Sequence, residues 1–258
     1  MTRSRTSGSV VVALCLGVAA LAVDVHPVAA EWFTDLYAGL NATESQHFSL
    51  DGDIHRTQTA GFVDDVQFAK SFTVGGRAGY WLESFKFFGV GLDVSYFRPD
   101  IKAQTATGKG TIADPKGVLF RVPINVFGAA PVSLPETDFG VVAVGFDLML
   151  RWPLLTSESF PRGQLQPYVT AGPAIYIPDL ERFHPSKFEP SLYIGRKAAS
   201  LYLGPKVAGG VTWFFAKNIG LFGEYRYTYS RPSADFGNIV FKTHLSTHHV
   251  LGGISVRY

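Results

Sequence analysis

Alternation of apolar and polar side chains is the sequence feature that most restricts what this chain can fold into. Phe222 to Ser230 reads FGEYRYTYS, with a tyrosine at every second position and Glu224 and Arg226 between them. A period of two predicts a β-strand, because successive side chains leave a pleated strand on opposite faces. Such a strand has one aromatic face and one ionic face.

The same alternation recurs in segments along the whole chain. We count eight: Asp35–Ala42, Phe72–Leu82, Phe87–Phe97, Val141–Trp152, Pro167–Ile177, Leu203–Phe215, Phe222–Ser230 and His249–Tyr258. Their lengths are close to the roughly 9–11 residues that a tilted strand needs to cross hydrocarbon. Aromatic residues gather toward the ends of the apolar faces, as they do at the two interfaces of a membrane barrel.

The polar faces of these segments carry charges of both signs. Five are positive and four negative: Asp35, Arg77, Asp93, Asp147, Arg151, Lys206, Glu224, Arg226 and Arg257. The interior of a closed eight-stranded barrel is only wide enough for side chains, and charges buried there must be paired. The nearly equal numbers of positive and negative side chains therefore favour charges that face the barrel interior in ion pairs over charges on a solvated face. The sequence predicts an all-β fold, an eight-stranded antiparallel up-and-down transmembrane β-barrel.

This interpretation makes specific demands on side chains. Glu224 and Arg226 should point inward, while Tyr225 and Tyr227 meet lipid. A slip of one residue would turn Arg226 into lipid at a cost of about 2–4 kcal/mol near the midplane. The expected partners of Glu224 and Arg226 are Arg77, Asp93, Asp147 and Arg151. Glycines are expected to make room for the long Arg and Lys side chains: Gly75, Gly79, Gly89, Gly91 and Gly210.

Residues 1–30 are predicted to be a secretory signal peptide. Two arginines precede an apolar run of 14 residues, Val10 to Val23, and the segment ends in Val-Ala-Ala. The run is too short to span a bilayer comfortably. Cleavage after Ala30 would remove Cys15, the single cysteine, and leave residues 31–258 as the barrel domain without thiol or disulfide chemistry. No later segment reads as a transmembrane helix.

The connections between the segments alternate in length. Tight or moderate turns are expected at 83–85, 154–164 and 216–218, on the periplasmic side. Long polar loops are expected on the outer side, at 43–71, 98–140, 178–200 and 231–247. Their apolar residues either bind a partner or pack on one another above the barrel: Phe48, Leu119, Phe120, Val126, Phe127, Leu192 and Tyr193.

Three stretches carry a resemblance to a known family. They are PYVTAGPAIYI, the GEYRY of the seventh segment and the terminal GGISVRY. Together they resemble the small eight-stranded outer-membrane β-barrels of the opacity-protein and OmpA-like group, a porin-family assignment. The resemblance implies export to the outer membrane of a Gram-negative bacterium. It also implies that Val256 and Tyr258 present the C-terminal signal to the barrel-assembly machinery.

The histidines at 244–249, HLSTHH, are the best enzyme candidate. Some small barrels modify lipid A with a His and a Ser, and Ser246 and His248 would leave a strand on the same side. The deacylase motif of that family, His-x-Ser-Asn, is absent. His244 and His248 lie about 13 Å apart along a strand, too far to share one metal ion without a bend. The sequence favours a polar rim of histidines, and DGDIH (Asp51–His55) is interpreted as a polar turn.

The sequence therefore predicts a non-enzymatic barrel with a narrow, salt-bridged lumen, and no cofactor or metal. Its surface loops would serve interaction or envelope integrity. The expected partners are outer-membrane lipid, lipopolysaccharide, the assembly machinery and an unknown extracellular partner of the loops, and we expect a monomer. A net charge of +2 gives no case for nucleic acid. Two alternatives stay open. One is a small passive or lateral channel that resembles the outer-membrane-protein-W barrels, and the other is a lipid A-modifying enzyme.

Overall fold

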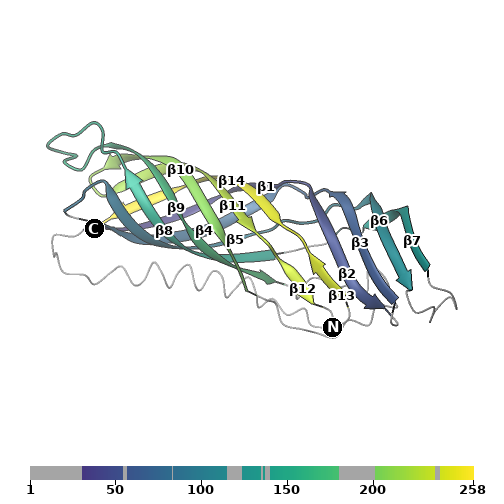
Figure 1. Cartoon of the computed structure of the whole chain (residues 1–258). Coiled ribbons are helices and arrows are strands. Elements are labelled where there is room, and N and C mark those ends of the chain that lie inside the picture. Colours follow the sequence, from purple (N-terminus) through teal and green to yellow (C-terminus); the bar gives the residue numbers. More distant parts are fainter. Residues whose placement is uncertain are drawn as a thin grey trace, which may run out of the picture.

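The computed structural model describes residues 31–54, 57–82, 84–114, 124–134, 136, 140–179, 201–235 and 239–258. The predicted signal peptide, residues 1–30, lies outside them. Eight strands form a closed antiparallel barrel, in which each strand pairs with the next barrel strand along the chain and the last pairs with the first (Figure 1). They are β1 (Glu31–Thr43), β4 (Ser71–Trp81), β5 (Phe88–Phe97), β8 (Gly140–Arg151), β9 (Leu165–Asp179), β10 (Tyr202–Ala216), β11 (Ile219–Ser230) and β14 (Leu245–Arg257).

Each of the eight predicted segments coincides with one of these barrel strands, and the predicted fold class is confirmed. Five strands, β1, β9, β10, β11 and β14, are longer than predicted, up to 15 residues in β9 and β10, whereas β4 and β8 have the predicted length and β5 is one residue shorter. Among the described residues, no helix is long and apolar enough to cross a membrane.

The two ends of the barrel differ. At one end, which we call the turn end, short turns join β4 to β5 and β10 to β11, and a longer connection joins β8 to β9. Glu31 and Tyr258 lie there too. From the other end a second sheet continues beyond the barrel (Figure 1). We call this sheet the extension. Its strand order is β12 (Ser233–Asp235), β13 (Ile239–Lys242), β2 (Gln46–Ile54), β3 (Thr57–Val66), β6 (Gln104–Asp114) and β7 (Ile124–Leu134).

The extension corrects the expectation of long polar loops. Three of the four expected loops contain paired strands, whereas residues 180–200 of the fourth lie outside the described residues. The expected turn at Asp51–His55 is also wrong in part, because Asp51 to Ile54 belong to β2 and pair with β3 and β13. His55 is outside the described residues. Pairing with neighbouring strands gives the backbone N–H and C=O groups of these polar segments the hydrogen bonds that water would otherwise provide.

A small apolar cluster lies where the extension joins the barrel. Val66, Phe68, Ile101 and Leu245 are buried there, with Phe48, Val63 and Leu134 packed against them. Phe48, one of the apolar loop residues predicted from the sequence, stacks on Phe68 at 6.4 Å between ring centroids. For Phe48, packing within the protein is therefore the observed outcome. The structure does not describe Leu119, Phe120, Leu192 or Tyr193.

An ion pair also ties the extension strands together. Lys109 of β6 donates a hydrogen bond to Asp64 of β3 at 3.0 Å, and His47 of β2 lies 2.6 Å from the other oxygen of the same carboxyl. The hydrogen bond from Lys109 holds the pKa of Asp64 below its ordinary value, with His47 adding to the effect. Asp64 thus carries its charge at neutral pH and joins three adjacent strands.

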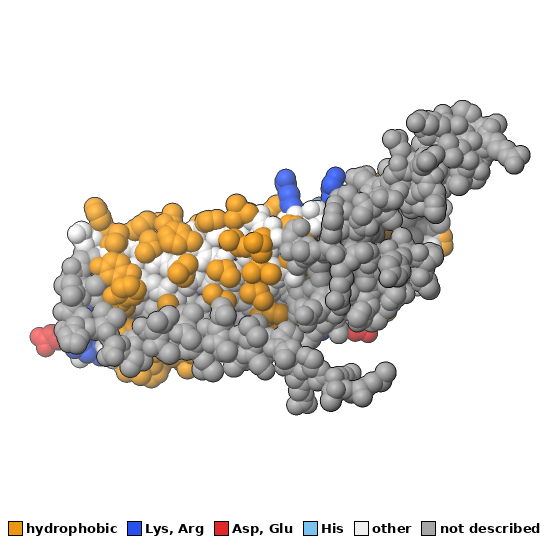
Figure 2. Space-filling model, turned by 90° about the horizontal axis from the view of Figure 1, so that it is seen from below, with side chains coloured by type: hydrophobic (Ala, Val, Ile, Leu, Met, Phe, Trp, Pro, Cys, Tyr) orange, Lys and Arg blue, Asp and Glu red, His pale blue; other side chains and the backbone are white. Residues whose placement is uncertain are grey.

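The outer wall of the barrel is a belt of apolar side chains. Leu36, Leu92, Leu148, Val207 and Ile254 are each between 45% and 60% exposed. In Figure 2 hydrophobic side chains gather over the barrel wall, and on this face charged groups appear toward its ends. An exposed apolar surface of this size is typical of contact with lipid. Large aromatic residues cluster at the turn end of the belt: Trp32, Phe85, Phe87, Trp152, Trp213, Phe215 and Tyr258.

Candidate functional site: the charged lumen

The charges predicted from alternation all lie inside the barrel. Each of the nine predicted lumen residues is buried, with at most 6% of its surface exposed. Glu31, which the sequence analysis did not single out, is buried with them. The described buried set therefore holds five Lys or Arg side chains and five Asp or Glu side chains. Opposite charges in equal number can be paired completely, which is the condition for burying them.

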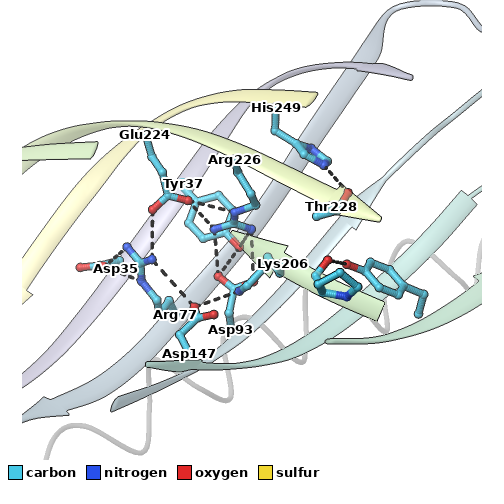
Figure 3. Close-up of polar contacts among 12 residues, drawn as sticks. Asp35, Tyr37, Arg77, Asp93, Asp147, Lys206, Glu224, Arg226, Thr228 and His249 are labelled. Carbon is cyan, nitrogen blue, oxygen red and sulfur yellow. Dashed lines mark hydrogen bonds and ion pairs between the residues drawn. The ribbon is translucent and has the colours of Figure 1, made fainter. Parts of the chain in front are cut away.

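Seven of these ten charges form one connected group, which we call the central network (Figure 3). Its members are Asp35, Arg77, Asp93, Asp147, Lys206, Glu224 and Arg226. They come from β1, β4, β5, β8, β10 and β11. Tyr168 of β9 donates to Glu224 at 2.8 Å, and Ser255 of β14 donates to Asp35 at 2.6 Å. The network thus connects all eight barrel strands across the lumen.

Arg77 joins one side of the network. Its guanidinium donates to Asp35 at 2.9 Å and to Glu224 at 3.0 Å. Asp35 lies directly opposite Arg77 in the β1–β4 register, so strand pairing brings these two side chains within reach of each other. Glu224 reaches Arg77 from the far wall of the barrel, a contact that sequence spacing does not encode.

Arg226 joins the other side. It holds both oxygens of Asp93, at 3.2 and 3.1 Å, and donates to Glu224 at 2.9 Å. Two-pronged contact of this kind suits the planar guanidinium. Tyr37 completes the corner, because it donates to Asp93 at 2.8 Å and accepts from Arg226 at 2.9 Å. Figure 3 shows Arg226 and Tyr37 side by side above Asp93.

Lys206 links the last two carboxylates. Its ammonium lies 2.9 Å from Asp147 and 3.0 Å from Asp93. Gly145 gives this side chain its space, because a Cβ there would lie 3.0 Å from the ammonium nitrogen. Glu224 and Arg226 point inward, as predicted. Their predicted partners Arg77 and Asp93 are also observed, because Arg77 contacts Glu224 and Arg226 contacts Asp93. Arg151, the remaining cationic candidate, lies elsewhere.

Arg151 belongs to a second group at the turn end. It donates two hydrogen bonds to Glu31, of which the longer is 2.9 Å, and its guanidinium lies 4.2 Å from the centre of the Trp81 ring. Arg257 lies 3.6 Å from Glu31 and stacks on the rings of Phe33, Trp81 and Phe214. Aromatic faces attract cations at these distances. The turn end of the lumen is thus filled by rings and two arginines.

A third layer lies toward the extension. The imidazole of His249 contacts Thr73 at 2.8 Å and Thr228 at 3.1 Å, and it meets the edge of Phe97. Asn41 donates to the Phe72 carbonyl and to Thr73. The central network thus lies between the rings and arginines at the turn end and the polar layer of His249 and Asn41.

The five inward glycines mostly leave space for aromatic rings. This corrects the expectation that they make room for Arg and Lys side chains. A Cβ at Gly75 would lie 2.5 Å from the Tyr37 hydroxyl, and one at Gly210 would lie 2.7 Å from that of Tyr168. Gly79 and Gly89 face the Phe33 and Trp81 rings in the same way. Of the five, only Gly91 approaches a cation, with the Arg77 side chain at 3.5 Å.

The histidine cluster divides between the two faces of β14. His249 points into the lumen, whereas Ser246 and His248 lie on the outer face beside the tyrosine row. His248 lies 2.5 Å from the Tyr225 hydroxyl and 2.9 Å from Glu44, and Tyr227 donates to Ser246 at 3.2 Å. Ser246 and His248 therefore have separate partners. Among the described residues, no group of three His, Cys, Asp or Glu is placed to hold a metal ion.

These features define an eight-stranded transmembrane β-barrel whose interior is a charge-paired core. No protein-family model matches the chain, and no curated protein matches it either. Solved structures do. OprG from Pseudomonas aeruginosa matches with 12% identity over 89% of this chain and 96% of that chain, with a TM-score of 0.49.

Neisserial surface protein A matches with 16% identity over 90% of this chain and the whole of the other, with a TM-score of 0.41. Ail of Yersinia pestis, solved with a heparin analogue, matches with 10% identity over 88% of this chain and 99% of that chain, with a TM-score of 0.32. None of these likenesses bears on function.

Proposed function

We propose that the chain is a non-enzymatic outer-membrane protein of a Gram-negative bacterium, with a closed lumen and an extension that meets the surroundings. The central network is the observation that carries this proposal. It connects all eight strands across the lumen through contacts of about 3 Å. Eight strands leave room only for side chains, and these side chains hold one another. Function is therefore assigned to the surface and the extension.

Closure of the lumen has a direct electrical consequence. We expect the refolded protein in a planar lipid bilayer to show no stable conductance steps, while a 16-stranded porin run in parallel shows large ones. The charges of the central network are held in place by one another across the lumen, so an applied voltage has no free ion path to open. Large, stable steps from the purified protein would contradict the closed lumen and favour the passive channel.

The hydrogen bonds of Ser246 and His248 support the non-enzymatic assignment over the hydrolase alternative. A serine nucleophile requires a base within hydrogen-bond reach. In this structure Ser246 accepts from Tyr227, while both imidazole nitrogens of His248 have partners in Tyr225 and Glu44. Loss of an acyl chain from lipid A incubated with the protein, abolished in Ser246→Ala, would overturn the non-enzymatic assignment.

The proposed orientation places the extension outside the cell and the turn end in the periplasm. Exposed lysines mark both ends, Lys70 and Lys102 beside the extension and Lys86 and Lys217 in the turns. We expect a membrane-impermeant amine reagent applied to intact cells to label Lys70 and Lys102, because, of these four lysines, they are the two beside the extension. Lys86 and Lys217 should react only after the outer membrane is permeabilised. The reverse pattern would invert the orientation.

A further inference from the structure

A groove crosses the outer wall of the barrel on the lipid-facing side. It is an open groove with a volume of about 580 Å³, and most of its lining residues point outward from β5, β8, β9, β10 and β11. Its walls are apolar, and Leu148, Leu150, Val169 and Val207 are each between 43% and 48% exposed. Because this surface is part of the apolar belt, it meets the hydrocarbon of a bilayer.

Strand register explains the shape of the groove. One wall is a row of directly paired residues, ordered from the turn end as Phe88, Leu150, Val169, Gly209 and Tyr225. The other wall is the next outward row: Leu148, Ala171, Val207 and Tyr227. The inward-facing residues Thr170 and Ala208 contribute their backbone to the floor between the rows. The small residues Gly209 and Ala171 lower the walls at mid-length.

The dimensions match a single hydrocarbon chain. Four steps between neighbouring strands, at about 4.8 Å each, give a length of about 19 Å, and rows two residues apart are separated by about 6.7 Å. A bilayer leaflet contributes about 15 Å of the hydrocarbon core, so one acyl chain lying obliquely fills the groove. A second copy of the barrel presents a convex wall and would bridge the groove without entering it.

The two ends of the groove are chemically different. At one end Tyr225 and Tyr227 close it, with their hydroxyls engaged by His248 and Ser246. At the other end the groove opens at Phe88, directly after a turn in which Lys86 is exposed. A cation at the open end complements a lipid phosphate. The chain terminus would then lie at the tyrosines and the headgroup at Lys86.

We propose that this groove binds one acyl chain of a phospholipid of the leaflet at the turn end, with its phosphate beside Lys86. The inference rests on the membrane location proposed above. The site involves the β5–β11 wall and is separate from the lumen and the extension. It would hold a lipid for longer than the rest of the belt does.

A photoreactive phospholipid tests the site. The protein is reconstituted into vesicles containing phosphatidylglycerol with a diazirine on its acyl chain, irradiated, and the labelled residues are mapped by mass spectrometry. We expect residues 148–150, 169–171 and 207–209 to carry about threefold more label than Leu36, Leu221 and Ile254, equivalent to a preference of about 0.7 kcal/mol. Those three belt residues are matched in exposure, at 46–50%.

Two glycine variants provide the matched comparison. Gly209→Leu fills the groove, because a Cβ there meets only ordinary contacts at 3.9 Å, and it should reduce groove labelling to the level of the belt. Gly223→Leu places the same side chain on the same face where nothing lies within 4 Å, and it should leave labelling unchanged. Lys86→Gln should lower groove labelling about threefold, since the phosphate loses its partner.

Uniform labelling around the belt, or groove labelling that persists in Gly209→Leu, would overturn the site. Barrel-to-barrel crosslinks centred on the groove would show that a second copy occupies it. Labelling that is unaffected by Lys86→Gln would remove the headgroup contact. Failure of the proposed membrane location has a different signature, because then neither the groove nor the matched belt residues would be labelled.

Discussion

Replacing Arg226 with methionine is expected to cost about 3–5 kcal/mol of unfolding free energy, because it leaves buried carboxylates without their cation. Arg226 donates one hydrogen bond to each carboxylate oxygen of Asp93 and a further one to Glu224. The central network holds three cations and four carboxylates, and the substitution leaves two against four. The measurement is urea-induced unfolding from lipid vesicles, with heat-modifiable gel mobility as a check on folding.

Two comparisons make this result specific to the buried charge. Arg231→Met removes an exposed arginine that stacks on Tyr229, so its cost should stay within about 0.5 kcal/mol. The double variant Arg226→Met/Glu224→Gln restores the original excess of one carboxylate and should recover part of the loss, which the double-mutant cycle quantifies. If Arg226→Met unfolded within 1 kcal/mol of the unmodified protein, the network would not be a principal source of stability.

The barrel could be predicted from the sequence because its signal is local. Alternation tells which face of a strand each side chain leaves by, and in a membrane barrel the lipid face must be apolar along its whole length. Asp93 and Arg226 could be placed inside the barrel from their neighbours alone. Pairing between Asp35 and Arg77 also follows once β1 and β4 are adjacent, because the register sets them directly opposite.

The remaining lumen contacts could not be predicted from alternation along single strands. Glu31 was missed because Phe33, which shares its inward face, is apolar, whereas Thr34 on the outer face is polar, so alternation is broken at the start of β1. Arg151 was predicted as a partner of Glu224 and Arg226, although it is the last residue of β8 and contacts Glu31 at the turn end. Glu224 meets Arg77 across the lumen, where sequence separation carries no information.

The extension was missed for a different physical reason. Its strands do not face lipid, so neither face needs to be continuously apolar, and segments such as QTATGKGTIAD alternate weakly. Their pairing is also distant in sequence, as when Phe241 of β13 pairs with Leu50 of β2. A polar, glycine-containing segment then reads as a loop, even where it forms a complete backbone ladder.

The final prediction concerns close approach of strands at a glycine. Gly172 of β9 lies so near β8 that an added Cβ would be 1.7 Å from the Phe146 carbonyl oxygen and 2.9 Å from the carbonyl carbon. Both atoms are backbone, so Gly172→Ala must separate the two strands beside Asp147, a member of the central network. We expect a cost of about 3 kcal/mol, at the upper end of the usual range for overpacking.

Gly223→Ala is the matched control for Gly172→Ala, because nothing lies within 4 Å of a Cβ at Gly223. Alanine restricts the unfolded chain more than glycine does, so this variant should be unchanged or more stable by about 0.5–1 kcal/mol. Urea unfolding from vesicles should separate the two variants by at least about 3 kcal/mol. Equal midpoints would mean that β8 and β9 can move apart freely at this point, and the tight β8–β9 contact would then contribute nothing to holding Asp147 against Lys206.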